Sequence, residues 1–149
     1  MTENYKYQLK EGKEFEKYVK KQLIEKRKLY LDIIEDKVEQ YTIGETMQGY
    51  EIKYDKLYKR WGNLYIEIKE KTNPQNYEYV LSGIFRDDNT HTWIIGDYTE
   101  VYMFKKNVLI DIYNNKEYFG NIIITKTSHG ILLNKPLIDK YNIDHINLE

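Results

Sequence analysis

The alternation of apolar and polar residues is clearest in two short stretches near the middle of the chain. In residues 64–69, three apolar residues alternate with Tyr65, Glu67 and Lys69, which is the pattern of a strand with one buried face. Residues 50–55, which follow Gly49, predict a second strand. Because strand residues i and i+2 share a face, we expect Glu67 and Lys69 to point the same way. If the two strands are neighbours in one sheet, Asp55 converges with Glu67.

Helical spacing dominates the part of the chain before these strands. Residues 11–29 place four apolar residues on one helical face, namely Phe15, Tyr18, Val19 and Leu23. The next apolar set is out of register with the first, and the shift falls at residues 26–28. This predicts a helix that breaks there and continues with Tyr30, Ile33, Ile34 and Val38. Residues 42–44 are expected to end it, and residues 56–62 to form a charged loop between the two strands.

The second half of the chain contains several short elements. Apolar runs stand at residues 80–85 and 92–95 on either side of the polar loop 86–91, and Gly96-Asp97 predicts a hairpin into residues 101–104. Residues 108–113 predict a short helix, residues 122–124 a buried strand, and residues 127–130 a turn before 131–133. Pro136 suits the first turn of a last helix. The expected fold class is α/β (α+β), with a small central mixed sheet flanked by helices in a single domain, 1–149.

Composition narrows the functional classes. The 149 residues include 23 basic and 24 acidic side chains, so the net charge of −1 does not steer the protein toward nucleic acid. Any such affinity must come from a local basic surface. No cysteine is present, which excludes disulfides and thiolate metal sites and makes a cytoplasmic setting the default. The apolar runs are too short to span a bilayer.

The residue types at the two predicted strands suit phosphodiester hydrolysis. That reaction needs a hard cation on the phosphoryl oxygens, an activated water and stabilisation of the departing oxyanion. Mg²⁺, or Mn²⁺ as a substitute, binds oxygen ligands and is often held by one or two carboxylates plus water. Asp55 and Glu67 would supply the carboxylates. Lys69 would position the attacking water or offset the charge that develops in the transition state.

At these residues the chain resembles a known family, the PD-(D/E)XK nuclease superfamily. The shared order is Asp55, eleven residues, and then Glu67-x-Lys69. The segments 49–55, 62–63 and 82–84 are similar to a phage and bacterial branch of that superfamily, and the resemblance covers roughly residues 12–104. It implies a restriction-endonuclease-like fold, Mg²⁺-dependent endonuclease cleavage of DNA that leaves 5′-phosphates, and frequent homodimers. It also implies an acid from the leading helix.

The resemblance assigns further residues and departs from the family pattern at one position. Gly12-x-x-Phe15-Glu16 suits the helix acid, with Glu14 or Glu45 as substitutes, and Ser82 is expected near the site. Tyr54 stands where the proline that names the motif is found. Lys53 shares a strand face with Asp55 and is the reserve candidate for the active lysine. A basic loop with an aromatic residue is expected to grip the DNA backbone and stack on an unpaired base, through Lys56, Lys59, Arg60 and Trp61.

Simpler interpretations stay open beside these. Asp55, Glu67 and Lys69 also fit the solvated face of a strand pair, whose ion pairs contribute well under ~1 kcal/mol. Residues 87–91 are acidic but lack the spacing of a calcium loop, so they predict a polar turn. The three histidines share no metal or nucleophile arrangement. The alternative function is a catalytically inactive nuclease-fold protein that binds DNA or a host protein, as a defence or counter-defence factor.

Overall fold

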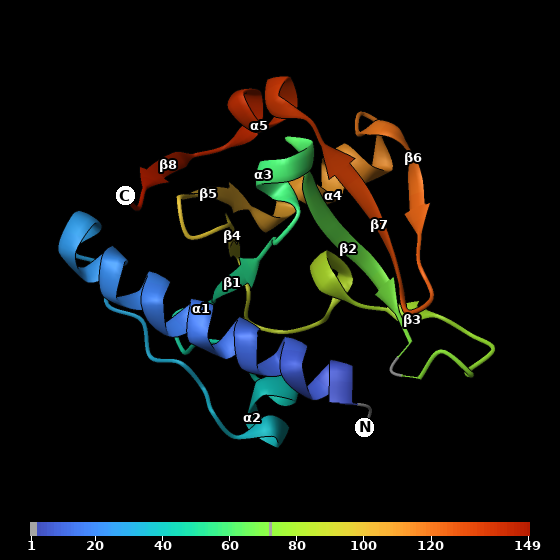
Figure 1. Cartoon of the computed structure of the whole chain (residues 1–149), viewed down its shortest axis with the longest axis horizontal. Coiled ribbons are helices and arrows are strands. Elements are labelled where there is room, and N and C mark those ends of the chain that lie inside the picture. The colour runs from blue at the N-terminus through green and yellow to red at the C-terminus, as the bar shows by residue number, and fades with distance from the viewer. Residues whose placement is uncertain (1–2, 72) are drawn as a thin grey trace.

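The computed structural model describes residues 3–71 and 73–149, with side chains from residue 6 onward. Within these ranges the chain forms an α+β fold with two four-stranded sheets (Figure 1). The helices are α1 Glu3–Arg27, α2 Lys37–Thr42, α3 Tyr58–Trp61, α4 Lys106–Asn114 and α5 Lys135–Tyr141. None of these described helices combines the length and apolar character needed to cross a membrane.

The first sheet is mixed and lies against α1. Its strand order is β1 (Tyr50–Tyr54), β4 (Thr92–Gly96), β5 (Glu100–Lys105) and β8 (Asp144–Asn147). Strand β1 pairs with β4 in parallel and the other pairs are antiparallel. Phe15, Val19 and Leu23 of α1 pack on Ile52 and Ile94 of this sheet. The predicted helical stripe of α1 therefore buries one face of the sheet, and Figure 1 shows α1 lying across β1.

The second sheet is entirely antiparallel. Its order is β3 (Val80–Leu81), β2 (Leu64–Glu70), β7 (Ser128–Leu133) and β6 (Phe119–Ile124). Leu64, Ile66 and Ile68 of β2 are buried in a core that also contains Trp93 and Ile95 of the first sheet. Residues from α4 and α5 complete that core. The alternating pattern of residues 64–69 thus places its apolar side in the main core.

The sequence predictions for individual elements are mostly confirmed. The strands predicted at 50–55 and 64–69 are β1 and β2, the hairpin at Gly96-Asp97 joins β4 to β5, and Pro136 lies in the first turn of α5. The expectation that β1 and β2 could be sheet neighbours is wrong, because they belong to different sheets. β1 pairs instead with β4, whose first residue, Thr92, lies 38 positions after the last residue of β1, Tyr54.

Other predictions need correction. The helix that was expected to continue over Tyr30–Val38 is absent between Lys28 and Asp36, because Lys28 takes a left-handed φ of 54° and Ile33 forms a β-bridge with Thr46. Part of the predicted loop 56–62 is the short helix α3, which ends at Gly62 with φ 73°. Strand β6 is largely exposed rather than buried. Ser128–Gly130 belong to β7 instead of a turn, and β8 was not anticipated.

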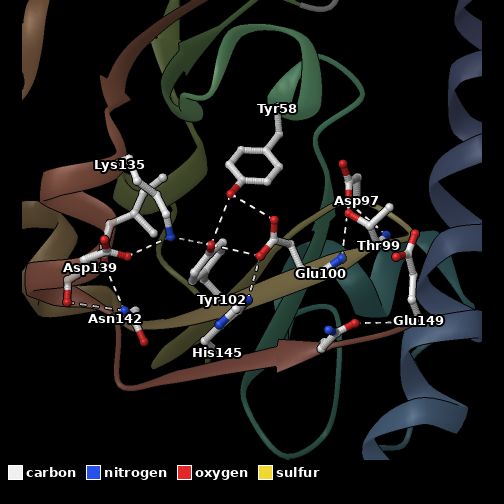
Figure 2. A network of polar contacts seen from close by, with 12 residues as sticks. Tyr58, Asp97, Thr99, Glu100, Tyr102, Lys135, Asp139, Asn142, His145 and Glu149 are labelled. Atoms are coloured by element: carbon white, nitrogen blue, oxygen red, sulfur yellow. Dashed lines mark hydrogen bonds and ion pairs between the residues drawn. The ribbon is translucent and has the colours of Figure 1, made fainter.

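A polar network ties the C-terminal elements to α3 (Figure 2). The Tyr58 hydroxyl of α3 lies 3.1 Å from the hydroxyl of Tyr102 and 3.2 Å from a Glu100 carboxylate oxygen. Tyr102 donates to Glu100 at 3.0 Å, and a ring nitrogen of His145 from β8 lies 2.6 Å from the same Glu100 oxygen. Lys135 of α5 donates to the Tyr102 hydroxyl at 2.9 Å. This network fixes α3, which is too short to be stable alone.

Candidate functional site

The site begins with two charged side chains on one face of β1. Ile52 points toward the buried stripe of α1, so its neighbours Glu51 and Lys53 point to the opposite side of the strand. Glu51 is 2% exposed, and its carboxylate lies 3.1 Å from the Lys53 ammonium. A buried acid needs such a partner, since an uncompensated charge in the interior is costly. Lys53 therefore compensates the charge of the buried Glu51 carboxylate.

Three more glutamates act on this pair. The cation Lys53 has a raised pKa because of Glu51 first, with Glu45 and Glu67 adding to the effect. Burial is the main cause that raises the pKa of Glu51. Burial also raises the pKa of Glu16 to about 7, and repulsion from Glu45 is the next cause. We call Glu16, Glu45, Glu51 and Glu67 with Lys53 the glutamate cluster; it combines one lysine with four acids.

Glu67 is held by the segment that follows β3. The Ser82 hydroxyl donates to a Glu67 carboxylate oxygen at 3.0 Å. Gly83 has φ 57°, and a Cβ there would lie 2.0 Å from the Glu67 carbonyl oxygen. Only glycine allows this left-handed conformation and this close approach together. Burial raises the pKa of Glu67, while Lys53 is the cation that most lowers it. The predicted place of Ser82 beside the acids is thus the observed one.

Asp55 is engaged in backbone hydrogen bonds. One carboxylate oxygen accepts from the Leu57 amide at 3.1 Å, and the other accepts from the Tyr65 amide at 2.8 Å. These bonds join the end of β1 to the start of β2 across α3. Burial raises the pKa of Asp55 against the lowering effect of the amides. Among the described residues, no three Asp, Glu or His side chains lie close enough to hold one metal ion together.

The two candidate lysines differ in their surroundings. Lys53 lies with the glutamates, whereas Lys69 is separated from Glu67 by an irregularity in the pairing of β2 with β7. The two residues directly opposite them on β7 are Gly130 and His129, so one extra residue of β2 falls between. The expected common face of Glu67 and Lys69 is therefore disturbed. The reserve candidate Lys53 is the lysine that the fold brings to the acids.

A cavity of about 650 Å³ adjoins the glutamate cluster. Its lining comes from the end of β1, the segment around α3, and the polar face of the second sheet, and includes Lys53, Asp55, Lys56, Trp61 and Glu67. Trp93 also lines it, and its buried indole nitrogen has no hydrogen-bond partner in the described part of the chain. Such a volume and mixed lining are typical of ligand sites. The cavity brings Asp55 and Glu67 to one space.

The predicted DNA-binding loop contributes Lys56 and Trp61 to this cavity, whereas the helix acid lies elsewhere. Lys56 pairs with Glu11 of α1 at 2.9 Å. Lys59, Arg60 and Trp61 are exposed on α3, and the Arg60 guanidinium lies 5.1 Å from the Trp61 ring centroid. Glu16, the helix acid, lines a separate concavity of about 320 Å³ together with Lys13 and Lys17 of α1.

Sequence reasoning missed Glu51 and gave Glu45 only as a substitute. The signal for Glu51 was present, because Glu51-x-Lys53 repeats the Glu-x-Lys spacing one strand earlier. In the sequence this pair looks like an ordinary solvated strand face. Only the packing of the second sheet over β1 shows that its acid is buried. Glu45 lies 3.8 Å from the Arg86 guanidinium, which partly balances its charge.

No known protein family matches the chain, and neither a curated protein nor a solved structure matches it. The resemblance to the PD-(D/E)XK superfamily therefore stays a prediction, and so does the restriction-endonuclease-like form of the fold.

Proposed function

We propose that the chain is a divalent-metal-dependent nuclease that acts on DNA. The observation that carries the proposal is the ion pair of the buried Glu51 with the half-exposed Lys53, which interacts electrostatically with three further glutamates beside a large cavity. Four acids and one lysine leave an excess of negative charge that burial makes costly. A divalent cation would remove that cost. Because Mg²⁺ commonly takes only one or two protein carboxylates, the lack of a three-residue group among the described residues is compatible with its binding.

The residues suggest distinct roles. Glu67 and Glu51 offer carboxylate oxygens for Mg²⁺ or Mn²⁺, which when bound would supply Lewis-acid activation of the phosphodiester. Lys53 would balance negative charge on the phosphate. Glu16, with a pKa near 7, could hold or release a proton at neutral pH. Ser82 orients Glu67 through its hydroxyl. Asp55 would act by fixing the junction of β1 and β2.

The cavity favours a substrate with exposed bases. Trp61 is 62% exposed and lines the cavity together with Tyr65. Aromatic side chains stack on unpaired bases of any sequence. The unpartnered indole N–H of Trp93 could donate to an acceptor on a bound base. We therefore expect single-stranded or branched DNA to be cut better than intact duplex.

The test is a cleavage assay on linear duplex, single-stranded and branched DNA with Mg²⁺ or Mn²⁺. Glu67→Gln and Lys53→Met should each reduce the cleavage rate by about 100-fold or more. Glu78→Gln, an exposed glutamate, and Lys69→Met serve as matched controls for the two charge changes. If Lys69→Met is the damaging lysine change, the assignment of Lys53 is wrong. Cleavage that survives in both Glu67→Gln and Lys53→Met would refute the nuclease proposal.

A second candidate is a protein that binds DNA or a host protein without cutting. Two observations favour it: no described three-residue metal group exists, and both oxygens of Asp55 already accept amide hydrogen bonds. This candidate predicts binding that is indifferent to EDTA and to Mg²⁺, with no nicking in the same DNA panel. Light scattering on the same samples would report whether the active form is a homodimer.

A further inference from the structure

Helix α1 separates its positive and negative charges onto different flanks. At about 100° per residue, six of its lysines fall within an arc of about 100° around the helix axis: Lys6, Lys10, Lys13, Lys17, Lys20 and Lys21. We call these six the lysine face. The buried stripe of Phe15, Val19 and Leu23 lies on another side, and Glu11 and Glu14 lie on the flank beyond it. Such segregation is not needed for packing, since all these charges point away from the core.

The lysine face is open and its charges are not neutralised. Five of its lysines are exposed and Lys20 is half-buried. Among the described side chains, none of the six has a carboxylate within ion-pair distance. Lys6, Lys10, Lys13 and Lys17 border a shallow concavity of about 500 Å³, and Lys37 of α2 adds a fifth cation to it. Glu14 lies at the edge of the same concavity.

The lysine face leads directly to the glutamate cluster. On the helix, Glu16 lies between the buried stripe and the lysine face. Lys13 and Lys17 line the concavity of about 320 Å³ that contains Glu16. Lys13 also lowers the pKa of Glu16 through its charge. Figure 1 shows α1 as a long helix with α2 on one side of it, and its exposed lysines are open to an elongated partner.

We infer that the lysine face is a track for the phosphate backbone of DNA, which guides the strand toward the glutamate cluster. The inference rests on the proposed nuclease function, because it names the surface that delivers the substrate to the site. With a net charge of −1 the whole chain exerts no attraction on DNA, so binding needs a local row of cations. From Lys6 to Lys21 the row extends about 22 Å, which matches about six to seven base pairs of duplex axis.

The decisive experiment compares two triple variants of equal net charge. In one, Lys10, Lys13 and Lys17 are changed to Gln; in the other, the exposed Lys105, Lys126 and Lys140 are changed to Gln. Binding of a labelled branched DNA with duplex arms is measured in EDTA over a salt series. We expect the α1 variant to lose about tenfold or more in affinity, with a slope of log affinity against log salt that is smaller by about 2–3. The control variant should behave like the wild type.

The outcomes separate this inference from the nuclease proposal. If both triple variants weaken DNA binding equally, or if the wild type binds anionic vesicles or an acidic peptide but not DNA, the lysine face is not a DNA track. If the wild type cuts DNA and the α1 variant cuts it with unchanged KM and salt dependence, the nuclease proposal stands and the track fails. If no cleavage occurs but the α1 variant alone loses DNA binding, the track stands and the nuclease proposal fails. Thermal unfolding of each variant verifies that it is folded.

Discussion

Glu16→Gln should remove a large part of the pH dependence of stability. In the unfolded chain the Glu16 carboxyl ionises near its ordinary value of 4.5, whereas burial and Glu45 raise its pKa in the folded chain to about 7. Between these two values the folded chain keeps a proton that the unfolded chain has lost. The unfolded state therefore binds fewer protons, and the free energy of unfolding falls as the pH rises through this window. Below about pH 4.5 the Glu16 carboxyl is protonated in both states, so its ionisation does not lower the stability of the folded chain.

The magnitude follows from the two pKa values. The difference between about 7 and 4.5 corresponds to at most about 3 kcal/mol. Glu16 is only partly buried, so solvent reduces this figure, and we expect about 1–3 kcal/mol. Glutamine occupies the same space and cannot ionise. Relative to the wild type, the variant should gain that amount of stability between about pH 4.5 and about pH 8.

Urea unfolding at several pH values measures this directly. The matched control is Glu14→Gln, which removes the same charge from an exposed position of the same helix and should keep the wild-type pH dependence. Parallel stability curves for wild type and Glu16→Gln across the whole range would refute the reasoning. In that case the Glu16 carboxyl would not experience the burial and repulsion that define the glutamate cluster.

Three further changes test the frame around the site, each by urea unfolding. Asp55→Ala should lower the free energy of unfolding by about 2–5 kcal/mol, because it leaves two backbone amides without their acceptor; loss of activity at unchanged stability would instead support a direct metal role. Gly83→Ala should cost about 2 kcal/mol or more, because its Cβ would strike the Glu67 carbonyl. Tyr102→Phe should cost about 1–3 kcal/mol by opening the network of Figure 2, whereas Tyr77→Phe at a fully exposed position should not.

The local pattern predicted most elements because the apolar side chains of each element pack against a single core. The alternation in β2 and the helical stripe of Phe15, Val19 and Leu23 face single cores, so periodicity alone identifies them. Residues 30–38 have the apolar spacing of a helix but do not form one before Lys37. Their actual conformation is set by the left-handed φ of Lys28 and the long-range bridge of Ile33, which no local pattern encodes.

The site was harder to predict than the strands that carry it. Spacing identified Glu67 as a site candidate, and the resemblance placed Glu16 and Ser82 near it. The pairing partner of β1 is a non-local property, however, and the sequence did not indicate that β1 and β2 lie in separate sheets. That separation brings Lys53 to Glu67. It also leaves Asp55 to bridge the connection between the strands.

The positions of the two tryptophans allow intrinsic fluorescence to report on ligand binding in the cavity. The chain contains only Trp61 and Trp93, and both line the cavity. One is 62% exposed and the other 1% exposed, so their emission should separate into a water-quenched red component and a shielded blue one. A guest that covers Trp61 would shift the red component. Occupancy could then be followed in real time on the unlabelled protein, with iodide as an external quencher.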